Sequence, residues 1–85
     1  MKITTATGKT FNVAWAGVAT IDGALRFELI GVSLRDAFDV FSNDTETKIL
    51  IYDWDGQVEE FYGYVLVKTV DVQPSGNIIV ALSKR

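Results

Sequence analysis

No cysteine and no histidine occurs among the 85 residues of this chain. A domain of this size often needs disulfide bonds or a bound metal ion, because it buries only a modest fraction of its surface. The usual side chains for both are missing, so packing of apolar side chains must hold the folded state. Apolar residue types make up 48% of the sequence and aromatic types 12%, enough for one compact core. We therefore expect a single domain over residues 1–85.

Short alternating segments separated by turn residues predict an antiparallel β-protein. Residues 2–5 and 11–15 form an expected N-terminal hairpin, and 24–29 shows the clearest alternation of apolar and charged side chains. The inner face of the hairpin is expected to carry Phe11, Val13 and Trp15.

Residues 47–54 and 58–64 predict a second hairpin, and 78–82 predicts a last strand that pairs with the strand before it. Gly63 interrupts the pattern and leaves two readings open. Either a tight bend separates two strands there, or one long bent strand continues through residues 65–72. We expect the long bent strand.

The hydrophobic period changes after Gly31 and predicts one short amphipathic helix, about 33–42, with Ser33 as its N-cap. Arg35 and Asp39 are expected in solvent. The side chains expected to pack onto the sheet are Leu34, Ala37, Phe38 and Phe41. The predicted fold class is therefore α+β, mainly antiparallel β, with six to seven short strands as a roll or small open barrel and the helix at one end.

The charge balance excludes some partners. The formal net charge is −3 and the calculated isoelectric point is about 4.7, which argues against sequence-independent binding to nucleic acid. No apolar run is long enough to span a bilayer, and the first residues lack the apolar core of a signal peptide. We expect no membrane partner and a protein that is cytoplasmic when it is made.

Gly8-Lys9-Thr10 matches the end of a phosphate-binding loop, but that motif requires a glycine five residues earlier, where Ile3 stands. Such a loop also opens a helix, whereas the residues from Phe11 onward predict a strand. We interpret the segment as a turn, and we expect no cofactor.

Four acidic residues surround the turn of the second hairpin: Asp53, Asp55, Glu59 and Glu60. Their spacing does not fit a calcium-binding loop. We expect a hairpin turn with solvated acids and no metal site.

A nucleophilic triad of the common kind requires histidine or cysteine, and nothing in the sequence places two carboxylates across a cleft. We therefore expect no catalytic residues.

Aromatic residues concentrate in the second hairpin, where alternation pairs Tyr52 with Trp54 on one face and Tyr62 with Tyr64 on another. Such residues either fill the core or form an exposed patch that docks a partner, since tryptophan and tyrosine are enriched at interaction hot spots. These four are the candidate partner-binding residues.

Short sequence segments spread over nearly the whole chain resemble those of small proteins encoded in phages and prophages of Gram-positive bacteria. In chain order these segments are Ile3-Thr4-Thr5, Thr7-Gly8-Lys9-Thr10-Phe11, Gly23-Ala24-Leu25-Arg26-Phe27-Glu28-Leu29, Tyr62-Gly63-Tyr64 and Val80-Ala81-Leu82. The resemblance carries no catalytic signature and no functional residues. It implies a gene among those for virion structure and assembly, and so a role at the head–tail junction or in the tail, with the virion as a second location.

The expected function is accordingly that of a non-enzymatic structural or assembly protein that acts through protein–protein contacts. Two alternatives remain: a module that binds a small ligand or host protein through an aromatic patch and, less favoured, an enzyme. A homo-oligomer is also expected, through a strand edge. The candidate edges are the apolar strand at residues 78–82 and the first strand at 3–5.

Overall fold

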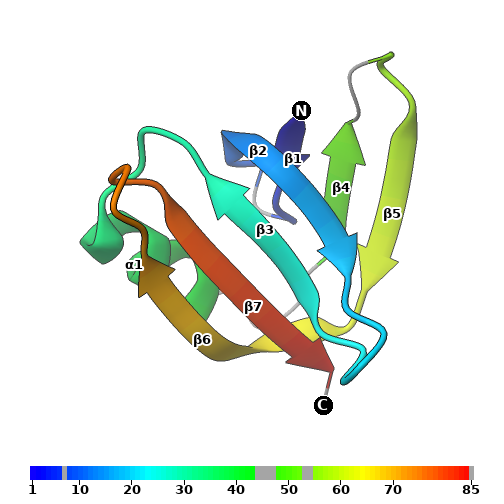
Figure 1. The fold of residues 1–85 in the computed structure, drawn as a ribbon. Coiled ribbons are helices and arrows are strands. Elements are labelled where there is room, and N and C mark those ends of the chain that lie inside the picture. The colour runs from blue at the N-terminus through cyan, green and yellow to red at the C-terminus, as the bar shows by residue number, and fades with distance from the viewer. Residues whose placement is uncertain (7, 44–47, 53–54, 85) are drawn as a thin grey trace.

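The computed structural model describes residues 1–6, 8–43, 48–52 and 55–84. Seven strands and one helix follow one another along these residues (Figure 1). In chain order they are β1 (Lys2–Thr4), β2 (Thr10–Val18), β3 (Leu25–Leu29), α1 (Leu34–Asn43), β4 (Lys48–Tyr52), β5 (Val58–Tyr62), β6 (Tyr64–Val72) and β7 (Ile78–Lys84). The prediction of a mainly antiparallel α+β fold with one short helix is confirmed.

The strands form one antiparallel sheet in the order β5-β4-β1-β2-β3-β7-β6. This sheet curls, because its first and last members in that order, β5 and β6, are joined at Gly63. Figure 1 shows β2, β3, β7 and β6 as a front layer, with β4 and β5 beside it at the right. Strand β2 takes part in both layers, since it pairs with β1 at its beginning and with β3 towards its end.

A β-bulge in β2 produces this change of layer. Val13 pairs with Leu29 and Ala16 pairs with Phe27, so β2 uses one more residue than β3 between the two pairs. The extra residue shifts the alternation. Ala16 packs against the core, and Trp15 is 40% exposed. The prediction that Trp15 shares the inner face with Phe11 and Val13 is therefore wrong.

The chain breaks at Gly63, where the sequence left two readings open. Gly63 has φ +78°, a left-handed conformation that glycine adopts without a steric penalty. Strand β5 ends at Tyr62 and β6 begins at Tyr64, and these two strands lie at opposite ends of the sheet order. The expectation of one long bent strand is wrong, and the tight bend is correct.

The core lies between the layers and under α1. Its largest fully buried side chains are Phe27, Ile3, Leu25, Leu29, Ile78, Leu82, Val13 and Val80. Phe41 of α1 joins them, with its ring centroid 5.1 Å from that of Phe27 and 6.1 Å from that of Phe11.

Helix α1 starts as predicted but presents a different face to the sheet. Ser33 is the N-cap, because its Oγ accepts a hydrogen bond from the Asp36 backbone N–H at 3.1 Å. Ala37 and Phe41 are buried as expected, and Val40 joins them. Leu34 and Phe38, in contrast, are 41% and 46% exposed, so the prediction that they pack onto the sheet is wrong.

The two predicted edge strands are not free edges. The first strand, β1, pairs with β2 on one side and β4 on the other, and β7 lies between β3 and β6. The ends of the sheet are instead β5 and β6.

Candidate functional site

A cleft of about 410 Å³ opens between the C-terminal half of β2 and the beginning of β5. On this side β2 pairs with β1 at its beginning, from Thr10 to Asn12. The partner of β2 on this side reaches only Met1, whose carbonyl oxygen accepts a hydrogen bond from the Val13 N–H at 3.0 Å. The residues that line the cleft are Met1, Ala16, Gly17, Val18, Gln57, Val58, Glu59 and Phe61.

Phe61 connects the cleft with the core. Its ring lies edge-on to Tyr64, with the centroids 6.1 Å apart and the planes at 72°. The Lys84 ammonium lies 5.0 Å from the centroid of the Tyr64 ring, a cation–π contact. Phe61 is half-buried and Tyr64 is only 6% exposed, so these contacts fix one wall of the cleft.

Of the four predicted partner-binding aromatics, the structure describes the side chains of two, Tyr62 and Tyr64, and it separates them. Tyr64 belongs to the core, whereas Tyr62 is 56% exposed and its hydroxyl donates to Glu60 at 2.5 Å. The bend at Gly63 separates the two, so the prediction that they share one face is wrong. The Tyr52 side chain and the whole of Trp54 lie outside the described residues.

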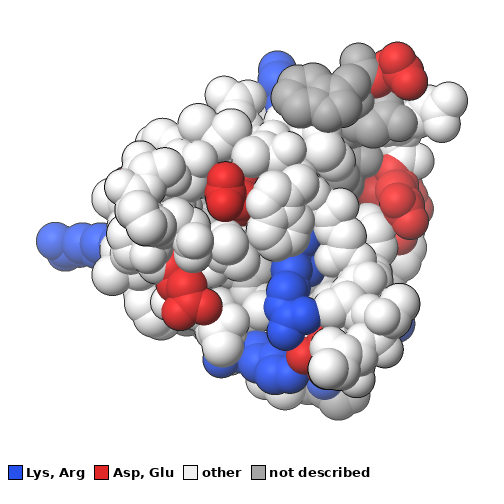
Figure 2. All heavy atoms as spheres, viewed as in Figure 1, with Lys and Arg blue, Asp and Glu red and all other residues white. Residues whose placement is uncertain are grey.

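Acidic side chains gather along β5 without forming a metal centre in the part of the chain that the structure describes. Asp55, Glu59 and Glu60 are all exposed, and no group of three or more His, Cys, Asp and Glu among the described residues is placed to hold a metal ion. Asp53, the fourth acid of the sequence cluster, lies outside the described residues. Figure 2 shows acidic atoms over β5 at the right of the molecule.

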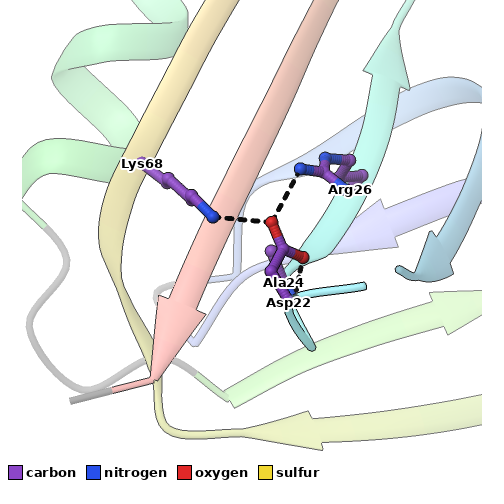
Figure 3. A network of polar contacts seen from close by, with 4 residues as sticks. All are labelled: Asp22, Ala24, Arg26 and Lys68. Carbon is purple, nitrogen blue, oxygen red and sulfur yellow. Dashed lines mark hydrogen bonds and ion pairs between the residues drawn. The ribbon is translucent and has the colours of Figure 1, made fainter. Parts of the chain in front are cut away.

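One carboxylate is held in a defined polar network at the turn that follows β2 (Figure 3). Asp22, in the turn between β2 and β3, accepts hydrogen bonds from Lys68 at 2.6 Å, Arg26 at 2.9 Å and the Ala24 backbone N–H at 3.0 Å. The bond from Lys68 is the largest cause that lowers the pKa of Asp22 from 3.8 to about 2, followed by the bond from Ala24.

This network has a structural role. Arg26 comes from β3 and Lys68 from β6, so the ion pairs connect two strands and a turn across β7, which lies between those strands. Both cations are engaged by the same carboxylate. Asp22 therefore acts as a clamp between elements, and it is not among the residues that line the cleft.

The glycine–lysine–threonine segment is a turn, as predicted. The Thr5 N–H donates to the Lys9 carbonyl oxygen and the Gly8 N–H donates to that of Thr5, each at 2.9 Å. Thr10 then begins β2, so no helix N-terminus is available there to hold a phosphate.

The cleft was not predicted from the sequence. Of its lining residues, Glu59 stood among the candidate groups as a solvated acid, and Phe61 stood among the aromatic residues of the second hairpin without being one of the four candidates. The missing signal was the bulge in β2, because it turns Ala16 inward. The shortness of residues 2–4 was the one available hint.

Comparisons of the chain with protein-family models, with curated proteins and with solved structures gave no match. In the described part of the chain, no helix is long and apolar enough to cross a membrane.

Proposed function

We propose that this chain acts without catalysis, as a docking module that binds other proteins. The setting that we propose is a phage or prophage virion or its assembly, at the head–tail junction or in the tail, as the sequence resemblance implies. The observation that carries the proposal is the exposure of large apolar side chains at two separate places.

The first place is the outer stripe of α1. Leu34 and Phe38 stand one helical turn apart and are both about half exposed, so they present a continuous apolar strip. The second place is the cleft, whose rim carries Val18 at 44% and Val58 at 48% exposure. Apolar surface of this kind on a small acidic domain favours contact with a partner.

The polar groups support binding more than catalysis. Asp22, whose pKa is lowered to about 2, is held by two cations and does not line the cleft. Among the cleft residues, Glu59 carries the ionisable side chain. A single exposed carboxylate offers no general acid–base pair.

The test begins with the genes that flank this one, which should encode capsid, head–tail or tail proteins. Co-expression of the tagged chain with those neighbours should then give a stable complex on size-exclusion chromatography. Phe38→Ser should weaken the complex if α1 docks, and Val58→Ser if the cleft docks. Neighbours for metabolism or transport, together with no stable complex, would overturn the proposal.

A second candidate function is the binding of a small molecule, because the cleft falls within the range of about 300–1,000 Å³ found for ligand sites. Its aromatic member is Phe61, in place of the predicted tyrosine patch. A fragment screen by NMR distinguishes the two functions. Saturable shifts at the amides of Gly17, Val58 and Phe61 with one chemical class of fragment would favour the ligand-binding module.

We also propose that the chain forms homo-oligomers through the outer edge of β5 or β6. Each of these strands pairs with one neighbour among the described residues, and an unpaired edge is a ready template for another strand. Sedimentation velocity at high and low protein concentration decides this point. A single monomeric species throughout would contradict it.

A further inference from the structure

The backbone of β2 has an edge whose hydrogen-bonding groups face the cleft. In an antiparallel pair, residues alternate between those that direct N–H and C=O towards the partner and those that direct them away. The Ala19 N–H donates to Ala24 at 2.9 Å, so residue 19 faces β3. Gly17, the register partner of Arg26, does the same two residues earlier. Ala16 and Val18 therefore point their backbone groups away from β3.

A second observation supports this assignment. The Ile30 N–H donates to the Asn12 carbonyl oxygen, and the Val13 N–H turns the other way and donates to Met1. The same alternation, continued through the bulge, gives the direction derived for Ala16 and Val18. Past Met1, no described strand pairs with this edge of β2. Both residues line the cleft.

We propose that an extended, cationic and apolar segment of a partner protein enters the cleft and adds to β2 as a new strand at Ala16 and Val18. This inference rests on the proposed docking function and specifies its site. The new strand continues the front layer of the sheet where β1 stops, and its main-chain groups satisfy the two free positions. Its alternate side chains then lie against Val58 and Phe61 on the opposite wall.

The acid in that wall, Glu59, indicates the chemistry of the partner, because Gln57, Val58 and Phe61 beside it in the cleft are uncharged. Glu59 lines the cleft, and its carboxylate has no hydrogen bond or ion pair to any described residue. A lysine or arginine in the entering strand would pair with it, whereas an acidic strand would be repelled.

The free edge is short, which sets the scale of the contact. Ala16 and Val18 are two residues apart, a distance of about 7 Å along a strand at roughly 3.4 Å per residue. The partner therefore engages about three residues in main-chain bonding, and the apolar wall supplies the rest of the affinity. We expect fast exchange on the NMR timescale.

The first experiment measures amide hydrogen exchange on the free, isotopically labelled chain. Once corrected for intrinsic rates, exchange at Ala16 and Val18 should be much faster than at Gly17, whose N–H is paired within the sheet. Slow exchange at Ala16 and Val18 in a monomeric chain would overturn the inference. Protection that appears only when the chain self-associates would overturn it too, since the occupant would be a second copy.

The second experiment adds a defined probe, the peptide acetyl-Lys-Val-Lys-Val-Lys-amide, and follows the amide signals. We expect shifts at Ala16, Val18, Val58 and Glu59, and slowed exchange at the first two. The glutamate analogue, acetyl-Glu-Val-Glu-Val-Glu-amide, should give no such shifts, and a version of the lysine peptide with N-methylated valines should bind at least several-fold more weakly. Equal shifts with both charges would overturn the proposed partner chemistry.

Paired variants separate the backbone from the side chain. Val18→Pro removes the free N–H but no hydrogen bond within the sheet, so it should abolish the shifts, whereas Val18→Ala keeps the donor and should retain them. Glu59→Gln should weaken the lysine peptide severalfold, and Asp71→Asn, the same charge change on exposed β6, should not. If the proline variant does not fold, the N-methylated peptide still tests the bonding to the backbone of β2, and Glu59→Gln with its control Asp71→Asn still tests the contact with the carboxylate.

The outcomes also separate this inference from the proposed function. Shifts of the lysine peptide confined to Leu34 and Phe38, or no shifts at all, would overturn the cleft as the strand-binding site. The co-expressed complex would be unaffected by either result. A complex that forms normally with Val18→Pro and Glu59→Gln would retain the docking function and refute the assigned site.

Discussion

Strands β3 and β7 differ from β2 and β5 in one respect, the number of neighbours, and much else follows from it. β3 lies between β2 and β7, and β7 lies between β3 and β6, so the backbone of each is paired on both edges. The C-terminal half of β2 and the whole of β5 have one paired edge each among the described residues. Within one small sheet, therefore, some strands are paired on both edges and others keep one edge exposed.

Side-chain burial follows the pairing. Leu25, Phe27 and Leu29 of β3 are fully buried, and so are Val80 and Ala81 of β7, although these last two point to opposite faces. In β5, by contrast, four of the five residues are exposed and Phe61 is half-buried. We infer that the stability of the domain is concentrated in β3, β7 and α1, while β2 and β5 keep surface available.

The largest predicted effect is at Phe27, in the middle of β3. Phe27→Ala removes a fully buried ring that contacts Phe41, so it should lower the free energy of unfolding by about 3–5 kcal/mol. The measurement is urea or thermal denaturation followed by circular dichroism. That loss is a large part of the stability of a domain this small, so unfolding at room temperature would also agree with the prediction.

Phe38→Ala provides the matched control, because the same atoms are removed from a ring that is 46% exposed. Its expected cost is roughly 1 kcal/mol. Equal losses for the two variants would show that the helix docks through Phe38 as well, contrary to the structure.

The regular elements could be predicted from the sequence because their patterns are local. Leu25, Phe27 and Leu29 alternate without interruption, and Ser33 with Asp36 marks the helix start, so pattern and capping rules were sufficient there. The helix face was harder. Four apolar residues fit one stripe, and only the position of the sheet decides that Val40 and Phe41 are covered while Phe38 is not.

The cleft could not be predicted for a related reason. It depends on pairs that are distant in the sequence: the short reach of β1 along β2, and the bulge between Val13 and Ala16. Strict alternation predicted Trp15 on the inner face of β2, because the sequence pattern of a strand does not reveal an inserted residue. The apolar residues 78–82 were equally ambiguous. The sequence predicted that they pair with the strand before them, which is β6, but it did not predict β3 on their other edge.

The next effect concerns the bend that joins β5 to β6. Gly63→Ala places a Cβ on a residue with φ +78°, and no heavy atom lies within 4 Å of that Cβ. The cost is therefore conformational alone, about 1–2 kcal/mol. Denaturation curves should show this loss with an unchanged dependence on denaturant.

Gly17→Ala is the control for that bend. Gly17 lies in β2 without a positive φ, and its Cβ also meets nothing within 4 Å. The variant should be slightly more stable than the parent, by about 0.4–1 kcal/mol, because alanine restricts the unfolded chain. A loss at Gly17 as large as that at Gly63 would contradict the assigned backbone conformations.

A smaller effect, dependent on pH, is expected at Asp22. The pKa of Asp22 lies at about 2 in the folded chain, below its ordinary value of 3.8, so the carboxylate stabilises the fold above about pH 4. That contribution is lost as the pH falls through 2. Asp22→Asn should therefore be less stable than the parent at pH 7, and the difference should vanish near pH 2. Asp71→Asn is the matched control, and a difference between Asp22→Asn and the parent that does not depend on pH would refute the network as its cause.

The smallest effect on stability is expected in the cleft, and this absence of effect is informative. Val58 is 48% exposed, so Val58→Thr, which keeps the shape and the β-branch, should change the free energy of unfolding by less than about 0.5 kcal/mol. Val72→Thr on β6, where Val72 is 56% exposed, should behave alike. The two variants should differ in binding: titration with the lysine peptide should show weaker affinity for Val58→Thr alone. A stability loss at Val58 comparable to that of a buried valine would mean that β5 belongs with β3 and β7, and that the cleft is filled in solution.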